Sequence, residues 1–148
     1  MKIIGVIGAG ECDKATYELA KEVGKEIAIC GCALICGGLG GVMEAAAKGA
    51  KEAGGLTIGV LPSSNPLDAN PYIDIPIVTG LGEARNIIIV RTAKVLIAIS
   101  GGYGTLSEIA FALKMDKPII GLNTWPGFEK IHYVKTPKEA IEKAKLWL

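Results

Sequence analysis

Glycine clusters that directly follow short apolar runs most constrain how this chain folds. The runs span residues 3–8, 33–36 and 95–99, and the glycines follow at 8–10, 37–41 and 101–104. Helical patterns separate the runs, and their apolar character on both faces is typical of strands in a parallel sheet covered by helices on both sides. The sequence therefore predicts a doubly wound, mostly parallel α/β sheet of Rossmann-like type in three layers, as one domain over residues 1–148.

Capping residues and periodicity predict the other elements. Asp13 is expected to cap a helix that runs to about Ala28, and Thr136 to cap the last helix. Residues 82–93 are interpreted as a helix, because no turn residue separates them from the strand at 95–99. Further helices are predicted at 42–53 and from 106 to about 115, and further strands at 56–61, 73–78 and 118–122, with an internal proline placing 73–78 at an edge.

Charge and composition exclude several classes of protein. Half of the 148 residues are hydrophobic, which excludes a disordered chain. Sixteen basic against fifteen acidic residues give a net charge of +1, without the basic excess typical of a nucleic-acid binder. The apolar runs are too short to cross a bilayer, and no cleavage site follows the first strand, so we expect a cytoplasmic protein without a membrane partner.

The four cysteines fall within 25 residues. They are Cys12, Cys30, Cys32 and Cys36. The Cys30-Gly-Cys32 pair suggests metal or redox use, but no second close pair follows and the single histidine is distant, so we expect no metal site. Packing in the core is the favoured interpretation, and a disulfide framework is disfavoured without a secretory context.

The glycine clusters predict an anion site. In a parallel sheet the carboxyl ends of all strands open onto one edge, where glycine exposes backbone amides and helix N-termini favour negative charge. The predicted phosphate ligands are Gly8, Gly10, Gly37, Gly38, Gly101, Gly102, Gly104 and the neighbouring Thr105. Any single cluster could be an ordinary strand-to-helix turn, but three together favour phosphate binding.

Two common phosphate-binding motifs are absent. The dinucleotide fingerprint fails because Asp13 stands where its third glycine belongs, and the strand at 33–36 ends without the acid that binds a ribose. No P-loop pattern occurs either. NAD and P-loop nucleotide hydrolysis are therefore disfavoured.

Residues 101–108, Gly-Gly-Tyr-Gly-Thr-Leu-Ser-Glu, resemble the G-G-x-G-T-x-x-E motif of the lysine-decarboxylase-like superfamily. Its best understood enzymes are the Lonely Guy (LOG) phosphoribohydrolases, which cut the base from nucleoside 5′-monophosphates. Arg85 and Arg91 match family arginines, and residues 37–43 resemble the G-G-x-x-G-x-M turn. The resemblance covers residues 1 to about 122.

The sequence also departs from LOG enzymes. Ser100 replaces the motif proline, and residues 83–86, Glu-Ala-Arg-Asn, lack the family's histidine and lysine. This segment looks closer to a branch related to molybdenum-cofactor carrier proteins and distantly similar to the DNA-processing protein DprA. No lysine lies among the site motifs, so lysine decarboxylation, which needs pyridoxal phosphate on a lysine, is not expected.

The resemblance implies roles for three residues. Arg85 would orient the ligand, and Glu108 would position water or stabilise the cation that develops at C1′ during glycosidic cleavage. Arg91 points about 120° away from Arg85 on a helix, so it is assigned to a supporting or subunit-interface salt bridge. Incidental surface positions for the arginines, and a capping box formed by Thr105 and Glu108, are the structural alternatives.

The sequence points to three functions, in order of preference. The first is a phosphoribohydrolase that requires no cofactor or metal, and the second is a non-catalytic carrier of a phosphorylated cofactor such as the molybdenum cofactor. A DprA-like DNA-associated protein is disfavoured by the charge balance. The apolar helices and the related proteins predict at least a homodimer.

Overall fold

The sheet of this chain has seven strands, and every neighbouring pair in it is parallel. The computed structural model describes residues 1–148, with strand order β4-β3-β2-β1-β5-β6-β7. The strands are β1 (Ile3–Gly8), β2 (Ala33–Cys36), β3 (Thr57–Leu61), β4 (Ile75–Val78), β5 (Val95–Ile99), β6 (Ile119–Leu122) and β7 (His132–Tyr133). The predicted doubly wound α/β fold is confirmed.

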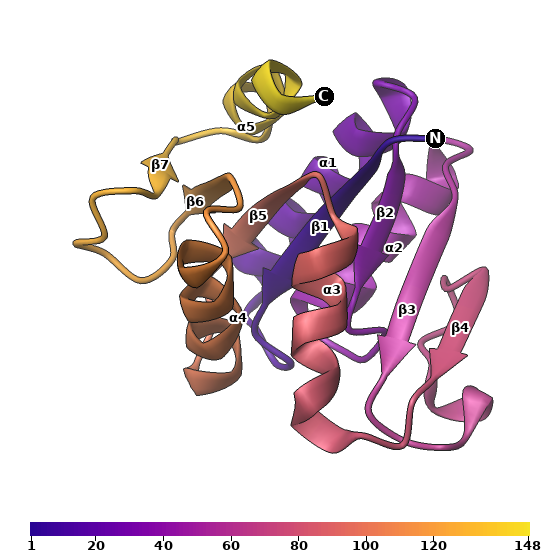
Figure 1. Cartoon of the computed structure of the whole chain (residues 1–148). Helices are drawn as coiled ribbons and strands as arrows, with labels where there is room; N and C mark the ends of the chain where they lie inside the picture. The colour runs from indigo at the N-terminus through magenta and orange to yellow at the C-terminus, as the bar shows by residue number, and fades with distance from the viewer.

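Helices cover both faces of the sheet, giving three layers (Figure 1). α1 (Lys14–Ile29), α2 (Val42–Glu52) and α5 (Pro137–Ala144) pack on one face, and α3 (Asn86–Thr92) and α4 (Tyr103–Lys114) on the other. Three short 3₁₀ turns complete the chain, namely η1 (Pro66–Asp68), η2 (Gly82–Arg85) and η3 (Lys145–Trp147). None of the helices combines the length and apolar character that spanning a membrane requires.

Two predicted helix caps are present. The Asp13 carboxylate accepts a hydrogen bond from the Thr16 amide at 2.8 Å, which fixes the start of α1. The Thr136 hydroxyl accepts one from the Glu139 amide at 3.1 Å at the start of α5. Local sequence therefore sets where these two helices begin.

The starts of two helices differ from the prediction. α4 begins at Tyr103 rather than Leu106, because the Leu106 amide donates to the Gly102 carbonyl at 3.0 Å and closes a turn within the glycine-rich segment. The predicted helix over 82–93 opens as the 3₁₀ turn η2 before α3 begins. The two-residue strand β7 was not predicted, since His132–Tyr133 is too short to show a strand pattern.

The winding of the sheet reverses between β1 and β5. The chain runs outward from β1 to β4 on one side and from β5 to β7 on the other. In open parallel sheets ligands bind at the carboxyl ends of the strands beside such a point. The turns after β1 and β5 meet there.

Candidate functional site

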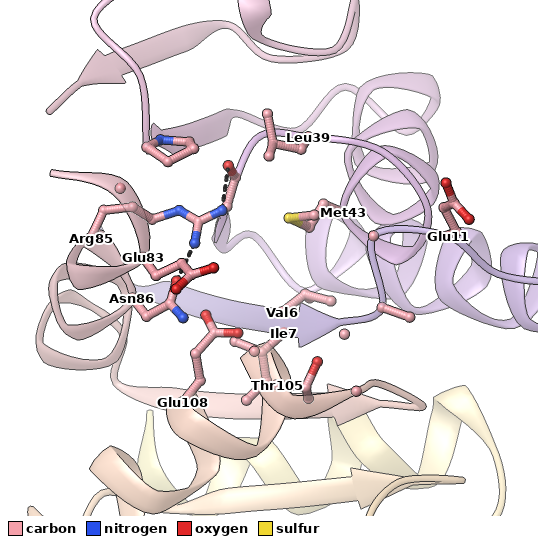
Figure 2. A pocket seen from close by; sticks show the side chains of 18 residues that line it. Val6, Ile7, Glu11, Leu39, Met43, Glu83, Arg85, Asn86, Thr105 and Glu108 are labelled. Atoms are coloured by element: carbon pink, nitrogen blue, oxygen red, sulfur yellow. Dashed lines mark hydrogen bonds between the residues drawn. The ribbon is translucent and has the colours of Figure 1, made fainter. Parts of the chain in front are cut away.

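One cavity of about 840 Å³ opens at the carboxyl ends of β1, β2 and β5. All three glycine clusters contribute to its lining, through Gly8, Gly10, Gly37, Gly102 and Gly104. Of the predicted side chains, Arg85, Thr105 and Glu108 also line it, from η2 and α4. Segments far apart in the sequence therefore face one cavity, which Figure 2 shows from close by.

The other two predicted glycines do not line the cavity. Gly38 and Gly101 have φ angles of +77° and +113°, in the left-handed region that favours glycine. A Cβ at Gly101 would overlap the Thr105 side chain, and one at Gly38 would press on Leu61. These two glycines shape the turns.

The N-terminus of α4 points its backbone amides at the cavity. Gly102 is the N-cap residue, and no side chain caps the helix. The first amides of a helix have no partner within it, so Tyr103, Gly104 and Thr105 present donors, and the helix dipole favours an anion. Thr105 is buried, and its hydroxyl adds a donor at the same end of the cavity.

Arg85 is buried, and its guanidinium makes hydrogen bonds to residues around the cavity. Its Nε donates to the Val60 carbonyl at 2.9 Å, one Nη lies 3.5 Å from the Gly37 carbonyl oxygen, and the other Nη donates to the Asn86 side chain. Burial lowers the pKa of Arg85, and the nearby Glu108 carboxyl partly offsets this effect. The guanidinium thus joins η2 to the ends of β2 and β3, and Arg85 lines the cavity.

Asn86 continues this hydrogen-bond chain. Its side-chain oxygen accepts from Arg85 while its amide nitrogen donates to the Ser107 hydroxyl at 3.1 Å. Ser107 in turn donates to the Gly104 carbonyl at 2.6 Å. Arg85 is therefore connected through two side chains to the glycine turn that begins α4.

Glu108 is buried without a partner in the protein. Its side chain is only 8% exposed, faces the cavity from α4, and accepts no hydrogen bond from any residue. Burial raises the pKa of its carboxyl to about 8, although Arg85 acts in the opposite direction. The capping-box alternative is wrong, because α4 begins at Tyr103 and Glu108 lies in its second turn.

Arg91 lies outside the cavity. Its residue is exposed on α3, and its guanidinium forms no ion pair within the chain. A salt bridge to a second subunit stays a prediction.

Several residues of the site were not predicted from the sequence. Glu83 lies with Arg85, Asn86 and Glu108 at one end of the cavity, while Glu11 lies at the far end beyond Met43 (Figure 2). Glu11 directly follows the glycine cluster at 8–10 and Glu83 directly follows Gly82, and these neighbouring glycines are the signal that could have identified them.

Asn70 was also missed. This buried side chain donates to the Leu39 carbonyl at 2.8 Å and accepts from the Tyr72 amide at 3.0 Å, and its own amide donates to Gly38 at 2.9 Å. The long loop after β3 is thereby tied to the second glycine cluster.

Comparison with known proteins gives similarities over the whole chain. A solved molybdenum cofactor binding protein from Rippkaea orientalis is 43% identical, with a TM-score of 0.93 over 98% of this chain and 96% of that one. The molybdenum cofactor carrier protein of Chlamydomonas reinhardtii is 41% identical, with a TM-score of 0.90 over 99% and 98%.

More distant similarities reach two other proteins. The cytokinin riboside 5′-monophosphate phosphoribohydrolase LOG of rice is 34% identical over 131 residues, covering 82% of this chain but only 54% of the rice enzyme. DprA from Streptococcus pneumoniae is 17% identical with a TM-score of 0.77, covering 97% of this chain and 62% of DprA, which shows a shared fold alone. The SLOG cluster4 family model matches residues 1–146, and the chain belongs to this family.

Proposed function

We propose that the cavity binds a small phosphorylated molecule that carries a heterocyclic ring, and that the protein acts as a carrier of that molecule. The molybdenum cofactor, a phosphorylated pterin, is the proposed cargo. The similarity to a carrier protein over nearly the full length of both chains supports this choice.

The donors at the N-terminus of α4 suit the phosphate end of such a ligand. Gly104 and Thr105 line one side of the cavity, where their amides and the Thr105 hydroxyl can donate to a phosphate. The cavity lining contains one cation, Arg85, and three carboxyl groups, so backbone donors rather than a cationic surface would hold the phosphate. This arrangement favours a single phosphate over a polyanion.

A carboxylate suits the ring end of the ligand. Glu83 is exposed and lines the cavity beside Arg85 and Glu108, and carboxylates accept hydrogen bonds from the N–H groups that pterins and purines carry. A ligand with a phosphate at one end and N–H donors at the other therefore matches both parts of the cavity.

The observation that carries the carrier proposal is the 41% identity to a molybdenum cofactor carrier protein over 99% of this chain and 98% of that one. The state of Glu108 agrees with it. With a pKa of about 8, this carboxyl is mostly neutral at pH 7. A neutral carboxyl lacks the charge that stabilises an oxocarbenium-like transition state. In this state the site offers groups that can bind the ligand, and Glu108 supplies little negative charge at neutral pH for a cation at C1′.

Hydrolysis of a nucleoside 5′-monophosphate is the second candidate. The resemblance assigns LOG chemistry to Arg85 and Glu108, and both residues line the same cavity. Their shared position favours hydrolysis. Ionised Glu108 would supply the missing charge, so base release should rise as the pH increases through about 8.

A binding titration followed by product analysis of the same sample tests both candidate functions. The protein is titrated with AMP, ribose 5-phosphate, inorganic phosphate and molybdenum cofactor released from a molybdoenzyme, and the bound fraction is then denatured and analysed for intact ligand and free base. We expect intact molybdenum cofactor to be recovered and no base to be released from AMP at pH 7. Release of base at pH 7 would overturn the carrier proposal in favour of hydrolysis, and failure of all four ligands to bind would overturn both.

Two arginine variants provide a matched pair. Arg85→Ala should weaken binding about tenfold or more, since hydrogen bonds to charged groups contribute about 1.5–3 kcal/mol. Arg91→Ala, the same change outside the cavity, should leave affinity unchanged. Thr105→Val keeps the side-chain shape and should also weaken binding, which guards against misfolding of the Arg85 variant. Equal effects of the two arginine variants would contradict the assigned site.

A further inference from the structure

Two cysteines form a close thiol pair at the turn between α1 and β2. Cys30 is the C-cap residue of α1, Cys32 directly precedes β2, and their sulfur atoms lie 3.5 Å apart. The turn leads into the amino end of β2, so the pair lies at the opposite edge of the sheet from the cavity. Nothing in the proposed function uses it.

The backbone of the turn brings the two side chains together. Gly31 has a φ angle of +80°, and its amide donates to the Ala28 carbonyl at 2.9 Å. The Cys32 amide donates to the Ile27 carbonyl at 3.2 Å, so the chain folds back over the end of α1. No atom lies within 4 Å of the place of a Cβ on Gly31, so this face of the turn is open to solvent.

The two thiols differ in exposure. Cys30 is half-buried and its thiol lies 3.1 Å from the Ile27 carbonyl oxygen, whereas Cys32 is only 6% exposed. A reagent from solvent therefore reaches Cys30 first, and Cys32 is protected beneath it.

We propose that Cys30 and Cys32 are a modification site at which a small disulfide, such as glutathione disulfide, converts the two thiols into an intramolecular disulfide. A disulfide has an S–S length of about 2.05 Å, so the 3.5 Å separation requires the sulfurs to approach by about 1.5 Å. Rotation about the side-chain torsions at the open turn can supply this movement.

The exchange balances in two steps. The Cys30 thiolate attacks glutathione disulfide, forms a mixed disulfide and releases one glutathione thiolate. The Cys32 thiolate then attacks the Cys30 sulfur and releases the second glutathione. The protein loses two electrons and two protons, and these electrons and protons end in two molecules of reduced glutathione. Burial and the contact with Cys30 raise the pKa of Cys32 to about 11, so the second step should accelerate as the pH rises.

The other two cysteines serve as internal references. Cys36 is fully buried, and burial raises the pKa of its thiol to about 12. Cys12 is half-buried near the start of α1 and has no thiol beside it. Neither residue offers both access and a second sulfur.

Intact mass and peptide mapping test the proposal on the wild-type protein. After incubation of the reduced, folded protein with glutathione disulfide, we expect a mass loss of two hydrogens, a disulfide that maps to Cys30 and Cys32, and recovery of the starting mass with dithiothreitol. A folded protein that keeps both thiols, carries a lasting glutathione adduct on Cys30, or forms its disulfide with Cys12 or Cys36 would overturn the proposal.

Serine variants separate the two steps. Cys32→Ser should retain glutathione on Cys30 because the resolving thiol is missing, and Cys30→Ser should form no disulfide. Cys12→Ser is the matched control and should behave like the wild type. Because the wild-type mass alone decides the main outcome, the test does not depend on the folding of any variant.

Discussion

At the scale of single residues, Glu108 and Arg85 are two buried ionisable groups with different surroundings. Arg85 has protein acceptors for both ends of its guanidinium, whereas Glu108 has no hydrogen-bond partner. Burial removes part of the hydration of the Glu108 carboxyl and raises its pKa, although Arg85 acts in the opposite direction, while Arg85 keeps its charge. A ligand with a donor group at this point would provide the missing partner.

Replacement of Glu108 by glutamine should make stability at high pH greater than in the wild type. The folded pKa of about 8 lies above the ordinary value of 4.5, so this carboxyl's contribution to stability is fully present below pH 4.5 and is lost as the pH rises through 8. Each pKa unit corresponds to about 1.4 kcal/mol. Urea unfolding from pH 4.5 to 9 should show a growing advantage of Glu108→Gln that levels off above pH 8. An advantage that does not change with pH would contradict the raised pKa.

Asn86→Ala should destabilise the protein by about 1–3 kcal/mol, because it leaves a buried Arg85 donor without a partner and removes the hydrogen bond to the Ser107 hydroxyl. Asn65→Ala is the matched control, since that side chain caps an exposed turn and accepts only from the Leu67 amide. Denaturant unfolding of both variants provides the comparison. A loss for Asn86→Ala no greater than that for Asn65→Ala would remove the proposed connection between Arg85 and α4.

At the scale of elements, the turn from β5 to α4 shows why the motif proline is absent. Ser100 has a φ angle of +53°, which proline cannot adopt, and its amide donates to the Leu122 carbonyl at 3.3 Å. The following Gly101 also has a positive φ. This turn therefore has a backbone path that excludes the proline of the related motif.

Two substitutions at Ser100 should have different effects on the free energy of unfolding. Ser100→Pro should lower the free energy of unfolding by about 2 kcal/mol or more, through strain and the lost hydrogen bond. Ser100→Gly should leave it within about 1 kcal/mol of the wild type, because glycine accepts this conformation. Thermal and urea unfolding measure both. Retained stability in Ser100→Pro would mean that the turn adopts another path in solution.

Much of this architecture could be predicted at the level of elements. Apolar runs fixed three strands to the residue, and Asp13 and Thr136 marked two helix starts, because these signals depend on near neighbours in the chain. The partners of Asn86 and Asn70 lie far away in the sequence, at Ser107 and Leu39, so no local pattern reveals them. The start of α4 was misplaced for another reason, since the glycine-rich segment carries no capping side chain to mark where the helix begins.

At the scale of the whole molecule, apolar side chains gather on the outer strand β4. Ile75, Ile77 and Val78 are each 40–45% exposed, and Leu81 beyond them is 56% exposed. An exposed apolar edge strand is a common site of association. We expect at least a homodimer, and light scattering after size exclusion should give twice the mass of the 148-residue chain or more. A monomer at micromolar concentration would contradict this expectation.

The central claim is that the glycine turns, Arg85 and Glu108 form one site for a phosphorylated ligand. The most direct test is a crystal structure of the protein with AMP bound. The account predicts the phosphate at the amides of residues 102–105, with Arg85 and Glu108 facing the rest of the molecule. Phosphate of the bound AMP at another surface of the protein would contradict it.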